Sequence, residues 1–185
     1  PSVGAVIARL RQPLSPATYR RITVLALVFL TLIVVTGAGV RLTGSGLGCT
    51  DWPTCSETEF VADRGDLHAM IEFVNRLITG LVSAAVALAV LGSHRRAPKR
   101  RDLIWLSWGL VAGVVGQVVL GAFVVLTHLN PWVVQGHFVL SMILLLNGMV
   151  LAHRAALPDG AVVRPAVTPA LLNWGRALVG LAVVV

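Results

Sequence analysis

Four polar or ionisable side chains interrupt the apolar stretch over residues 67–80: His68, Glu72, Asn75 and Arg76. Their spacing of i, i+4, i+7 and i+8 puts them on one face of an α-helix. An ionisable group in hydrocarbon costs about 2.5–3.5 kcal/mol, so such residues usually face the interior of a helix bundle and belong to a functional site. We therefore expect the chemistry of this protein on that face.

A second histidine, His137, is related to His68 by an internal repeat. Residues 34–43 and 118–127 are identical at seven of ten positions, and each copy precedes an apolar run with a histidine near its start. At a rise of about 1.5 Å per residue, both histidines and Glu72 fall within roughly 10 Å of the same boundary of the hydrocarbon. We expect these groups to converge on one site.

Two facing imidazoles suit a haem iron, which histidines commonly hold inside a helix bundle. Zinc is the competing metal. A zinc ion needs three or four coordinating side chains close together, and here only His68 and Glu72 form a compact pair. The simpler interpretation is that both histidines are interfacial residues that hydrogen-bond to their neighbours. For Glu72 and Arg76 the simpler interpretation is an i,i+4 ion pair, which lowers the cost of burying both charges.

The composition identifies the elements that must position these groups. The chain of 185 residues is 56% hydrophobic and 12% charged, with a mean hydropathy of +0.84, whereas a soluble domain is about 25% charged. We predict an all-α integral membrane protein, a four-helix transmembrane bundle of two repeated helix pairs. The spans are expected at about 22–40, 67–92, 103–126 and 133–152, each close to the roughly 20 residues that cross a bilayer.

The basic residues set the expected orientation. The formal net charge is +7, but the arginines cluster between apolar runs without interleaved aromatics, so we expect no nucleic-acid partner. The positive-inside rule predicts a cytoplasmic tail over 1–21, a basic cytoplasmic loop over 94–102 and a cytoplasmic linker over 154–169. The acidic loop that contains Cys49 and Cys55 is then outside, in a multi-pass protein of the cell membrane.

Residues 170–185 begin a fifth apolar helix, which is too short after Arg176 to cross the membrane alone. The chain also begins without methionine. We therefore expect this chain to be part of a longer protein with at least one further helix.

The third span carries Gly109, Gly113 and Gly116 on one face, and small residues at this spacing predict close helix packing. Gln117 is expected to hydrogen-bond across to a neighbouring helix. Trp105, Trp108, Trp132 and Trp174 lie near predicted boundaries and are interpreted as interfacial anchors.

Cys49 and Cys55 enclose five residues and lie on the side where disulfides persist. A disulfide across this loop would contribute roughly 2–3 kcal/mol. A structural clip and a redox-active pair both remain open, because the spacing is not the C-x-x-C of thioredoxin-like sites. The preceding glycines, Gly44, Gly46 and Gly48, lack the lysine and the strand of a phosphate loop, so we interpret them as a flexible loop.

Three segments carry a resemblance to a known family: TGAGVRLTGSGLGCTDWPTC (36–55), IEFVNR (71–76) and GAFVVLTHLNPWVVQGH (121–137). Together they resemble the N-terminal half of the haem A synthase family of bacteria and mitochondria. The resemblance covers about residues 22–152, and its specific parts are the cysteine loop and the I-E-F-x-x-R run.

The resemblance implies an eight-helix membrane oxidoreductase of two similar four-helix halves, which oxidises the C8 methyl group of haem O to a formyl group. The product, haem A, serves the assembly of terminal oxidases. The N-terminal half is expected to hold haem O as substrate and the C-terminal half a haem b. Glu72 matches the catalytic acid of the family, His137 its fourth-helix histidine, and Cys49 and Cys55 its outer-loop pair.

One residue departs from the family pattern, which is usually E-x-x-H-R and here has Asn75 at the histidine position. Asparagine is a poor iron ligand, so we expect His137 and His68 as the metal ligands, with no second protein ligand as the alternative. Asn75 and Arg76 complete the predicted haem-binding set, and Arg76 is expected to pair with Glu72 or with a haem propionate.

The resemblance also implies partners, namely membrane lipid, a haem O synthase, a quinone or another electron acceptor, and further copies of the chain. Two other functions compete with haem A synthesis. One is a b-type electron-transfer subunit that carries haem without altering it, and the other is a membrane transporter, to which intramembrane charge also points.

Overall fold

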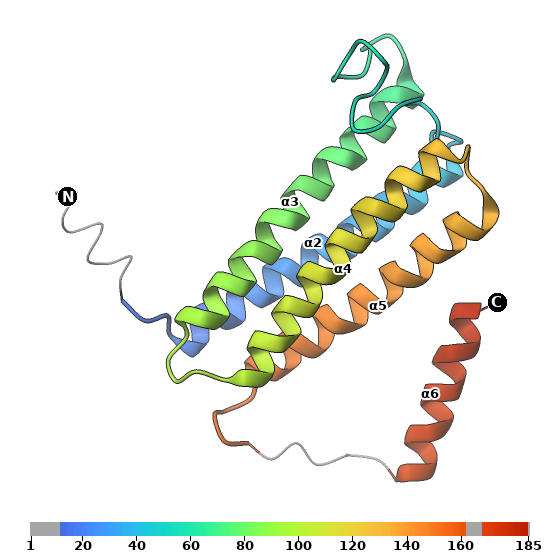
Figure 1. Ribbon diagram of the computed structural model, residues 1–185. Coiled ribbons are helices and arrows are strands. Elements are labelled where there is room, and N and C mark those ends of the chain that lie inside the picture. The colour runs from blue at the N-terminus through green and yellow to red at the C-terminus, as the bar shows by residue number, and fades with distance from the viewer. Residues whose placement is uncertain (1–11, 162–167, 185) are drawn as a thin grey trace, which may run out of the picture.

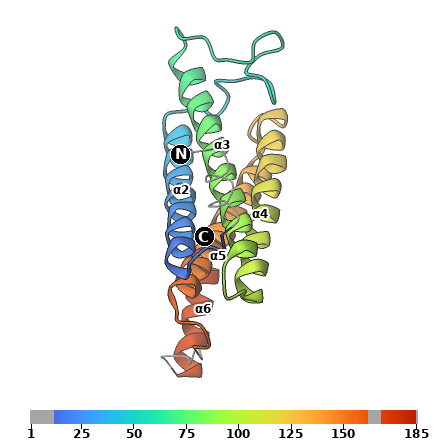
Figure 2. The same cartoon turned by 90° about the vertical axis from the view of Figure 1, so that its left-hand side faces the viewer.

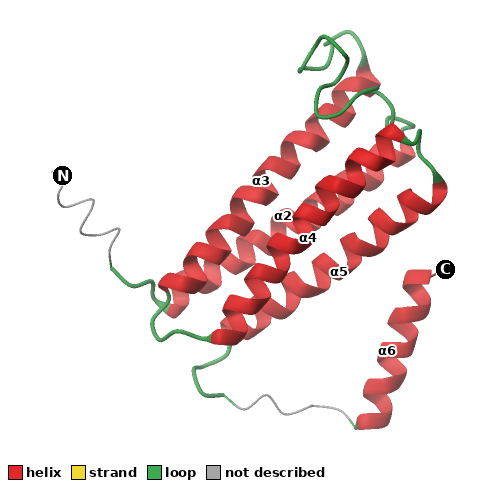
Figure 3. Cartoon of the chain, in the orientation of Figure 1, coloured by secondary structure: helices red, strands yellow, loops and turns green. Residues whose placement is uncertain are grey.

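The computed structural model describes residues 12–161 and 168–184, and all regular structure in these residues is helical. The helices are α2 (Pro16–Leu42), α3 (Leu67–Arg95), α4 (Arg101–Leu126), α5 (Pro131–Ala156) and α6 (Pro169–Val184) (Figure 1). Figure 3 shows the connections as loops, with no strand in the described part of the chain. The predicted all-α fold is confirmed.

Side chains that cap the first turn mark the start of three of the long helices. Ser15 caps α2 by accepting a hydrogen bond from the Thr18 N–H, and Pro16 occupies the first turn. Asp66 accepts from the N–H groups of His68 and Ala69 at the start of α3. Asn130 caps α5 in the same way, again followed by proline. These side chains satisfy N–H groups that a helix leaves without intrahelical partners.

Four helices form an antiparallel bundle, which Figure 2 shows from a second side. Helix α2 packs against α3 and α5, and α4 packs against the same two helices. Helices α3 and α5 therefore lie diagonally across the bundle. One end, the disulfide end, carries the loop that contains Cys49 and Cys55, and the other, the basic end, carries the connection from α3 to α4.

The bundle is a membrane bundle by length and composition. Each of its helices contains an 18-residue window with a mean hydropathy between 1.7 and 2.5, and is long and apolar enough to cross a bilayer. Large apolar side chains cover the outside as well as the inside. Val28, Val35, Leu81 and Ile143 are among those that are exposed, as expected for side chains that face lipid.

Each predicted span lies inside one of the four long helices, but α2 begins earlier than expected. The sequence interpretation placed residues up to 21 in a tail, whereas α2 begins at Pro16. The Ser15 cap starts the helix there, and Tyr19 is fully buried against the glycine surface at Gly92 of α3. Residues 1–11 of the predicted tail, and Arg164 of the linker, lie outside the described residues.

The glycine stripe of α4 packs against α5, as its spacing predicts. A Cβ atom on Gly109 would contact Asn147, on Gly113 it would contact Leu144, and on Gly116 it would contact Leu140. Gln117 bonds across to the same helix, donating to Ser141 Oγ at 2.7 Å and to the His137 carbonyl at 3.2 Å. Both predictions for this helix are confirmed.

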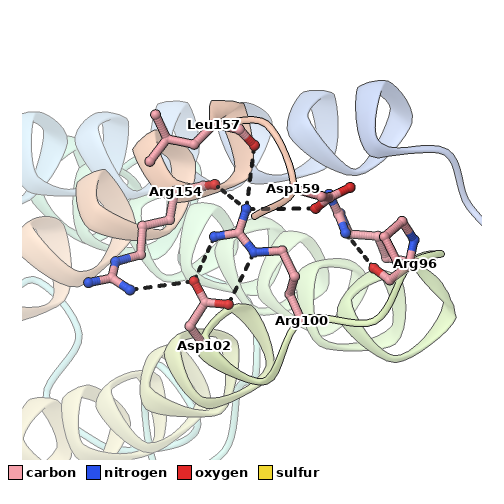
Figure 4. Close-up of polar contacts among 7 residues, drawn as sticks. Arg96, Arg100, Asp102, Arg154, Leu157 and Asp159 are labelled. Atoms are coloured by element: carbon pink, nitrogen blue, oxygen red, sulfur yellow. Dashed lines mark hydrogen bonds and ion pairs between the residues drawn. The ribbon is translucent and has the colours of Figure 1, made fainter. Parts of the chain in front are cut away.

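Ion pairs join the chain segments at the basic end (Figure 4). Arg100 donates to the Asp102 carboxylate at 2.7 and 3.2 Å and to the carbonyl of Arg154 at the end of α5. Arg96, which is 1% exposed, donates to Asp159 at 2.6 Å and to the Pro98 carbonyl. The basic residues that predict the orientation thus also have a structural role, because they join the α3–α4 connection to the C-terminal end of α5.

Helix α6 lies apart from the bundle (Figure 1). The side chains described for it, including Leu171 and Trp174, are exposed.

Substitution of Gly113 by alanine is predicted to destabilise the bundle. The added Cβ would lie 2.7 Å from Leu144 Cγ, and Leu144 is buried, so α4 and α5 must move apart. Overpacking of this kind costs about 1–3 kcal/mol. The thermal unfolding midpoint of the purified protein should fall.

Gly80→Ala is the matched control, because Gly80 also lies in a long helix and no atom lies within 4 Å of its added Cβ. Its midpoint should stay the same or rise, since alanine is the better helix former. Equal midpoints for the two variants would contradict the tight contact between α4 and α5.

Candidate functional site

A disulfide closes the loop that precedes α3. Cys49 and Cys55 are bonded with an S–S distance of 2.03 Å, which confirms the predicted disulfide. The Thr50 N–H donates to the Cys55 carbonyl, and the Cys55 N–H donates to the Glu59 carbonyl. Both cysteines are buried, so the bridge is packed against the rest of the protein.

The carboxylate of Glu72 lies directly beneath this loop. It is only 6% exposed, and its Oε2 accepts a hydrogen bond from the Cys49 N–H at 3.0 Å. Its Oε1 forms an ion pair with Arg76 at 2.6 Å, which confirms the predicted i,i+4 pair. The arginine supplies the opposite charge that a buried carboxylate needs, and both carboxylate oxygens have partners.

Arg76 holds the other side of the same loop. Its Nη1 donates to the carbonyls of Asp51 at 3.1 Å and Thr54 at 2.9 Å, while Nε and Nη2 donate to Glu72. These contacts occupy four of the five N–H bonds of the guanidinium group. Of the two predicted roles for Arg76, the contacts therefore support the pair with Glu72 more than a bond to a propionate.

The glycines before Cys49 have defined roles rather than the flexibility that their sequence suggests. Gly44 has a φ of +67°, in the left-handed region that favours glycine. A Cβ on Gly48 would lie 2.4 Å from the carbonyl carbon and oxygen of His68. The loop backbone therefore touches the first turn of α3 at a position that only glycine allows.

His68 and Asn75 each bond to a neighbouring segment. The exposed His68 has its Nδ1 3.0 Å from Ser45 Oγ, in the loop. Asn75 Oδ1 accepts a hydrogen bond from Thr36 Oγ1 of α2 at 2.8 Å. The four-residue face predicted on α3 is thus divided, because His68, Glu72 and Arg76 contact the loop whereas Asn75 contacts α2.

His137 lies on α5 at the disulfide end, in contact with α4. Its Cε1 is 3.6 Å from the position that a Cβ of Gly121 would take. Its Nδ1 is buried and has no hydrogen-bond partner among the described residues, and the same holds for Oε1 of the neighbouring Gln117. Buried polar atoms without hydrogen-bond partners are uncommon in proteins. Two of them on neighbouring residues, His137 Nδ1 and Gln117 Oε1, therefore indicate either a ligand site or side chains that rotate to bond to each other.

The predicted site residues therefore gather at one end of the bundle, on two diagonal helices. His68, Glu72 and Arg76 begin α3, and His137 is in the second turn of α5. No hydrogen bond joins His68 to His137 in the described part of the chain. Among the described residues, no group of three or more His, Cys, Asp or Glu side chains is arranged to hold a metal ion such as zinc.

Sequence reasoning missed the partners of these side chains. The Cys49 N–H and the carbonyls of Asp51 and Thr54 bind Glu72 and Arg76 through the backbone, which carries no sequence signal. The hydroxyl groups of Ser45 and Thr36 bond to His68 and Asn75, but each partner is more than 20 residues away in the chain, so the sequence does not reveal the contact. For Gln117, its isolation in an apolar helix was the one available signal.

Comparison with known proteins places this chain in a family of cytochrome oxidase assembly proteins. The sequence model of a family described as cytochrome oxidase assembly protein matches residues 20–69 and 58–185. A haem A synthase of Lysinibacillus sphaericus is 31% identical over 65% of this chain and 39% of its own length. Another, from Alkalihalophilus pseudofirmus, is 28% identical over 75% of this chain and 46% of its own length.

A third relative, a haem A synthase of Geobacillus kaustophilus, is 31% identical over 60% of this chain and 34% of its own length. The chain thus spans less than half the length of these curated relatives. No solved structure matches the chain.

Gly48→Ala is predicted to displace the disulfide loop from α3. The added methyl group would overlap the His68 carbonyl, which belongs to the backbone of a helix and cannot rotate away. The loss of contact should expose the Cys49–Cys55 disulfide to solvent. The rate of its reduction by a soluble thiol, measured in the folded protein, should rise at least several-fold.

The control is Gly65→Ala, in the same connection, where the nearest atom to the added Cβ is an Asp63 side-chain oxygen at 3.5 Å. This variant should be reduced at the rate of the parent protein. A Gly48→Ala protein that is also reduced at the parent rate would show that the loop does not depend on this contact.

Proposed function

The chain belongs to the cytochrome oxidase assembly protein family that includes the haem A synthases, and from that premise we propose that it binds haem O for oxidation to haem A. The reaction converts the C8 methyl group of haem O to a formyl group. The observation that carries the proposal is the placement of Glu72 and His137 at the same end of a membrane bundle, on helices that face each other diagonally.

His137 fits the role of the iron ligand. Its Nδ1 is buried and has no hydrogen-bond partner among the described residues, so we assign Nε2 to the iron of haem O. Histidines that bind a metal usually donate their other N–H to a nearby acceptor, which fixes the tautomer and the ring orientation. Oε1 of Gln117 is a buried acceptor without a partner beside the same residue, and we assign it this positioning role.

His68 is our choice for the opposite ligand. Its Nδ1 is engaged by Ser45, so Nε2 is free to bind iron in the neutral tautomer with the proton on Nδ1. Asn75 is the weaker candidate, because its amide oxygen already accepts from Thr36 and an amide is a poor iron ligand. Asn75 contributes instead to the wall of the site on the α2 side.

Glu72 is the proposed catalytic acid. Oxidation of a methyl group to a formyl group releases protons with the electrons, so the site needs a group that accepts and passes on protons. Glu72 is the one buried carboxylate at this end among the described residues, and the Cys49 N–H and Arg76 hold it in place. The haem supplies the iron and the conjugated ring, and the protein residues supply position and proton transfer.

The resemblance further implies a haem b in the other half of the enzyme and an electron acceptor such as a quinone. Both belong to the full-length protein, as do a haem O synthase partner and self-association. They enter the proposal through the family resemblance.

His137→Ala is predicted to remove the substrate haem from the full-length protein. Loss of the imidazole takes away the iron ligand, so the absorption band of the bound haem O should decrease and extracted haem O should fall at least tenfold. His153→Ala, at the basic end of the same helix, is the control and should keep its haem O. A His137→Ala protein with parental spectrum and occupancy would show that another residue holds the iron.

Gln117→Leu separates positioning from ligation in the same experiment. It should keep most of the haem O and shift the absorption maximum, because the iron ligand remains but loses its acceptor.

Recovery of haem B alone from the parent protein would instead support a b-type electron carrier, and recovery of no stoichiometric haem would support a transporter.

Glu72→Gln is predicted to abolish haem A formation while keeping the loop in place. Glutamine retains an oxygen that accepts from the Cys49 N–H, but it cannot take up a proton. Formation of haem A should fall at least tenfold, and the reduction rate of the disulfide should change little. Parental formation of haem A in this variant would exclude a catalytic role for the acid.

A further inference from the structure

The basic end of the bundle holds more cations than its acids neutralise. Six of the eight acidic residues of the chain lie between positions 51 and 72, which leaves Asp102 and Asp159 for the other end. These two carboxylates are already paired. Asp102 binds Arg100 at 2.7 Å and Arg154 at 3.5 Å, and Asp159 binds Arg96 at 2.6 Å (Figure 4).

Five further cations at this end are exposed, and their side chains have no hydrogen bond or ion pair within residues 12–161 and 168–184. They are Arg20, Arg21, Arg95, Lys99 and Arg101. We call them the free basic cluster.

The fold gathers the free basic cluster from three helices and the α3–α4 connection. Backbone hydrogen bonds from the Leu14 N–H to the Arg95 carbonyl at 2.9 Å, and from the Ala97 N–H to the Leu14 carbonyl at 3.1 Å, join the start of α2 to the end of α3. Lys99 and Arg101 flank Arg100, whose ion pairs fix the start of α4 beside the end of α5. The cations are therefore held around one end of the bundle.

Two exposed tryptophans mark the depth of this end in the membrane. Trp105 and Trp108 of α4 are 76% and 48% exposed, and they follow Arg101 by about 6 and 10 Å along the helix. Trp108 Nε1 donates to His94 Nε2 at 3.2 Å, which leaves its ring at the bundle surface. Tryptophan side chains prefer the level of the lipid headgroups, so the free basic cluster lies at or just beyond that level.

We propose that the free basic cluster binds the headgroups of anionic phospholipids. The phosphate groups of a bilayer lie at this depth around the whole bundle, and lipid-facing apolar helices continue directly from the cations. A negatively charged lipid supplies the counter-charges that the protein itself lacks here. An acidic soluble protein is less suited, because the cations surround a bundle end that is embedded at headgroup level.

The proposal does not depend on haem chemistry, and the test uses charge-matched double variants. Lys99→Gln with Arg101→Gln removes two cations of the cluster. Neither residue packs in the core, and loss of a cation at the first residue of α4 relieves an unfavourable interaction with the helix dipole. Arg41→Gln with Arg64→Gln removes two exposed cations near the disulfide end and is the control.

Binding is measured on the full-length protein in detergent by native mass spectrometry, with phosphatidylglycerol, phosphatidylcholine and inorganic phosphate as separate probes. The parent should bind phosphatidylglycerol more tightly than phosphatidylcholine. The Lys99/Arg101 variant should bind phosphatidylglycerol at least about tenfold more weakly, since each cation near an anionic surface contributes a few-fold. The Arg41/Arg64 variant should bind like the parent, and the haem content of all three proteins should be equal.

Three results would overturn the proposal. The first is parental binding of phosphatidylglycerol by the Lys99/Arg101 variant. The second is an equal loss in both variants, which would mean that only net charge matters. The third is displacement of the lipid by inorganic phosphate at equal concentration, which would indicate a phosphate site rather than a lipid site.

Discussion

The free-energy cost of a charge in hydrocarbon governs the arrangement of this molecule. Most ionisable groups of the described residues lie near the two ends of four apolar helices. Glu72 and Arg76, inside α3 near the disulfide end, neutralise each other at 2.6 Å. The pair does more than cancel charge. Its remaining hydrogen-bonding groups bind the backbone of the Cys49–Cys55 loop, so the buried pair and the closed loop hold each other in place.

The bundle topology follows from the same constraint. Helices in a membrane satisfy their own backbone groups and then associate by close packing, which here uses Gly109, Gly113 and Gly116 of α4 against α5. Antiparallel packing of neighbours leaves α3 and α5 diagonal. A ligand bound between α3 and α5 at the disulfide end would lie between the helix that carries Glu72 and the helix that carries His137, which is the basis of the proposed haem O site.

The two ends of the bundle differ in how they treat their charges. At the disulfide end the loop covers Glu72, and His137 Nδ1 and Gln117 Oε1 are buried with no hydrogen-bond partner among the described residues. At the basic end Arg96, Arg100 and Arg154 pair with the two carboxylates, Asp102 and Asp159, and join the segments. The free basic cluster is exposed. The proposed haem O site and the proposed lipid site thus lie at opposite ends of the bundle.

The sequence by itself determined the membrane class, the four spans, the disulfide, the Glu72–Arg76 pair and the packing role of the α4 glycines, because composition, length and i,i+4 spacing act locally. It did not determine the start of α2, where the Ser15 cap and burial of Tyr19 outweigh two neighbouring arginines. It also placed His68, Glu72, Asn75 and Arg76 on one functional face. Only the tertiary structure shows that they contact different segments, because their partners are the backbone of a distant loop and Thr36 of α2. A backbone partner is present at every residue, so the residue types cannot reveal it.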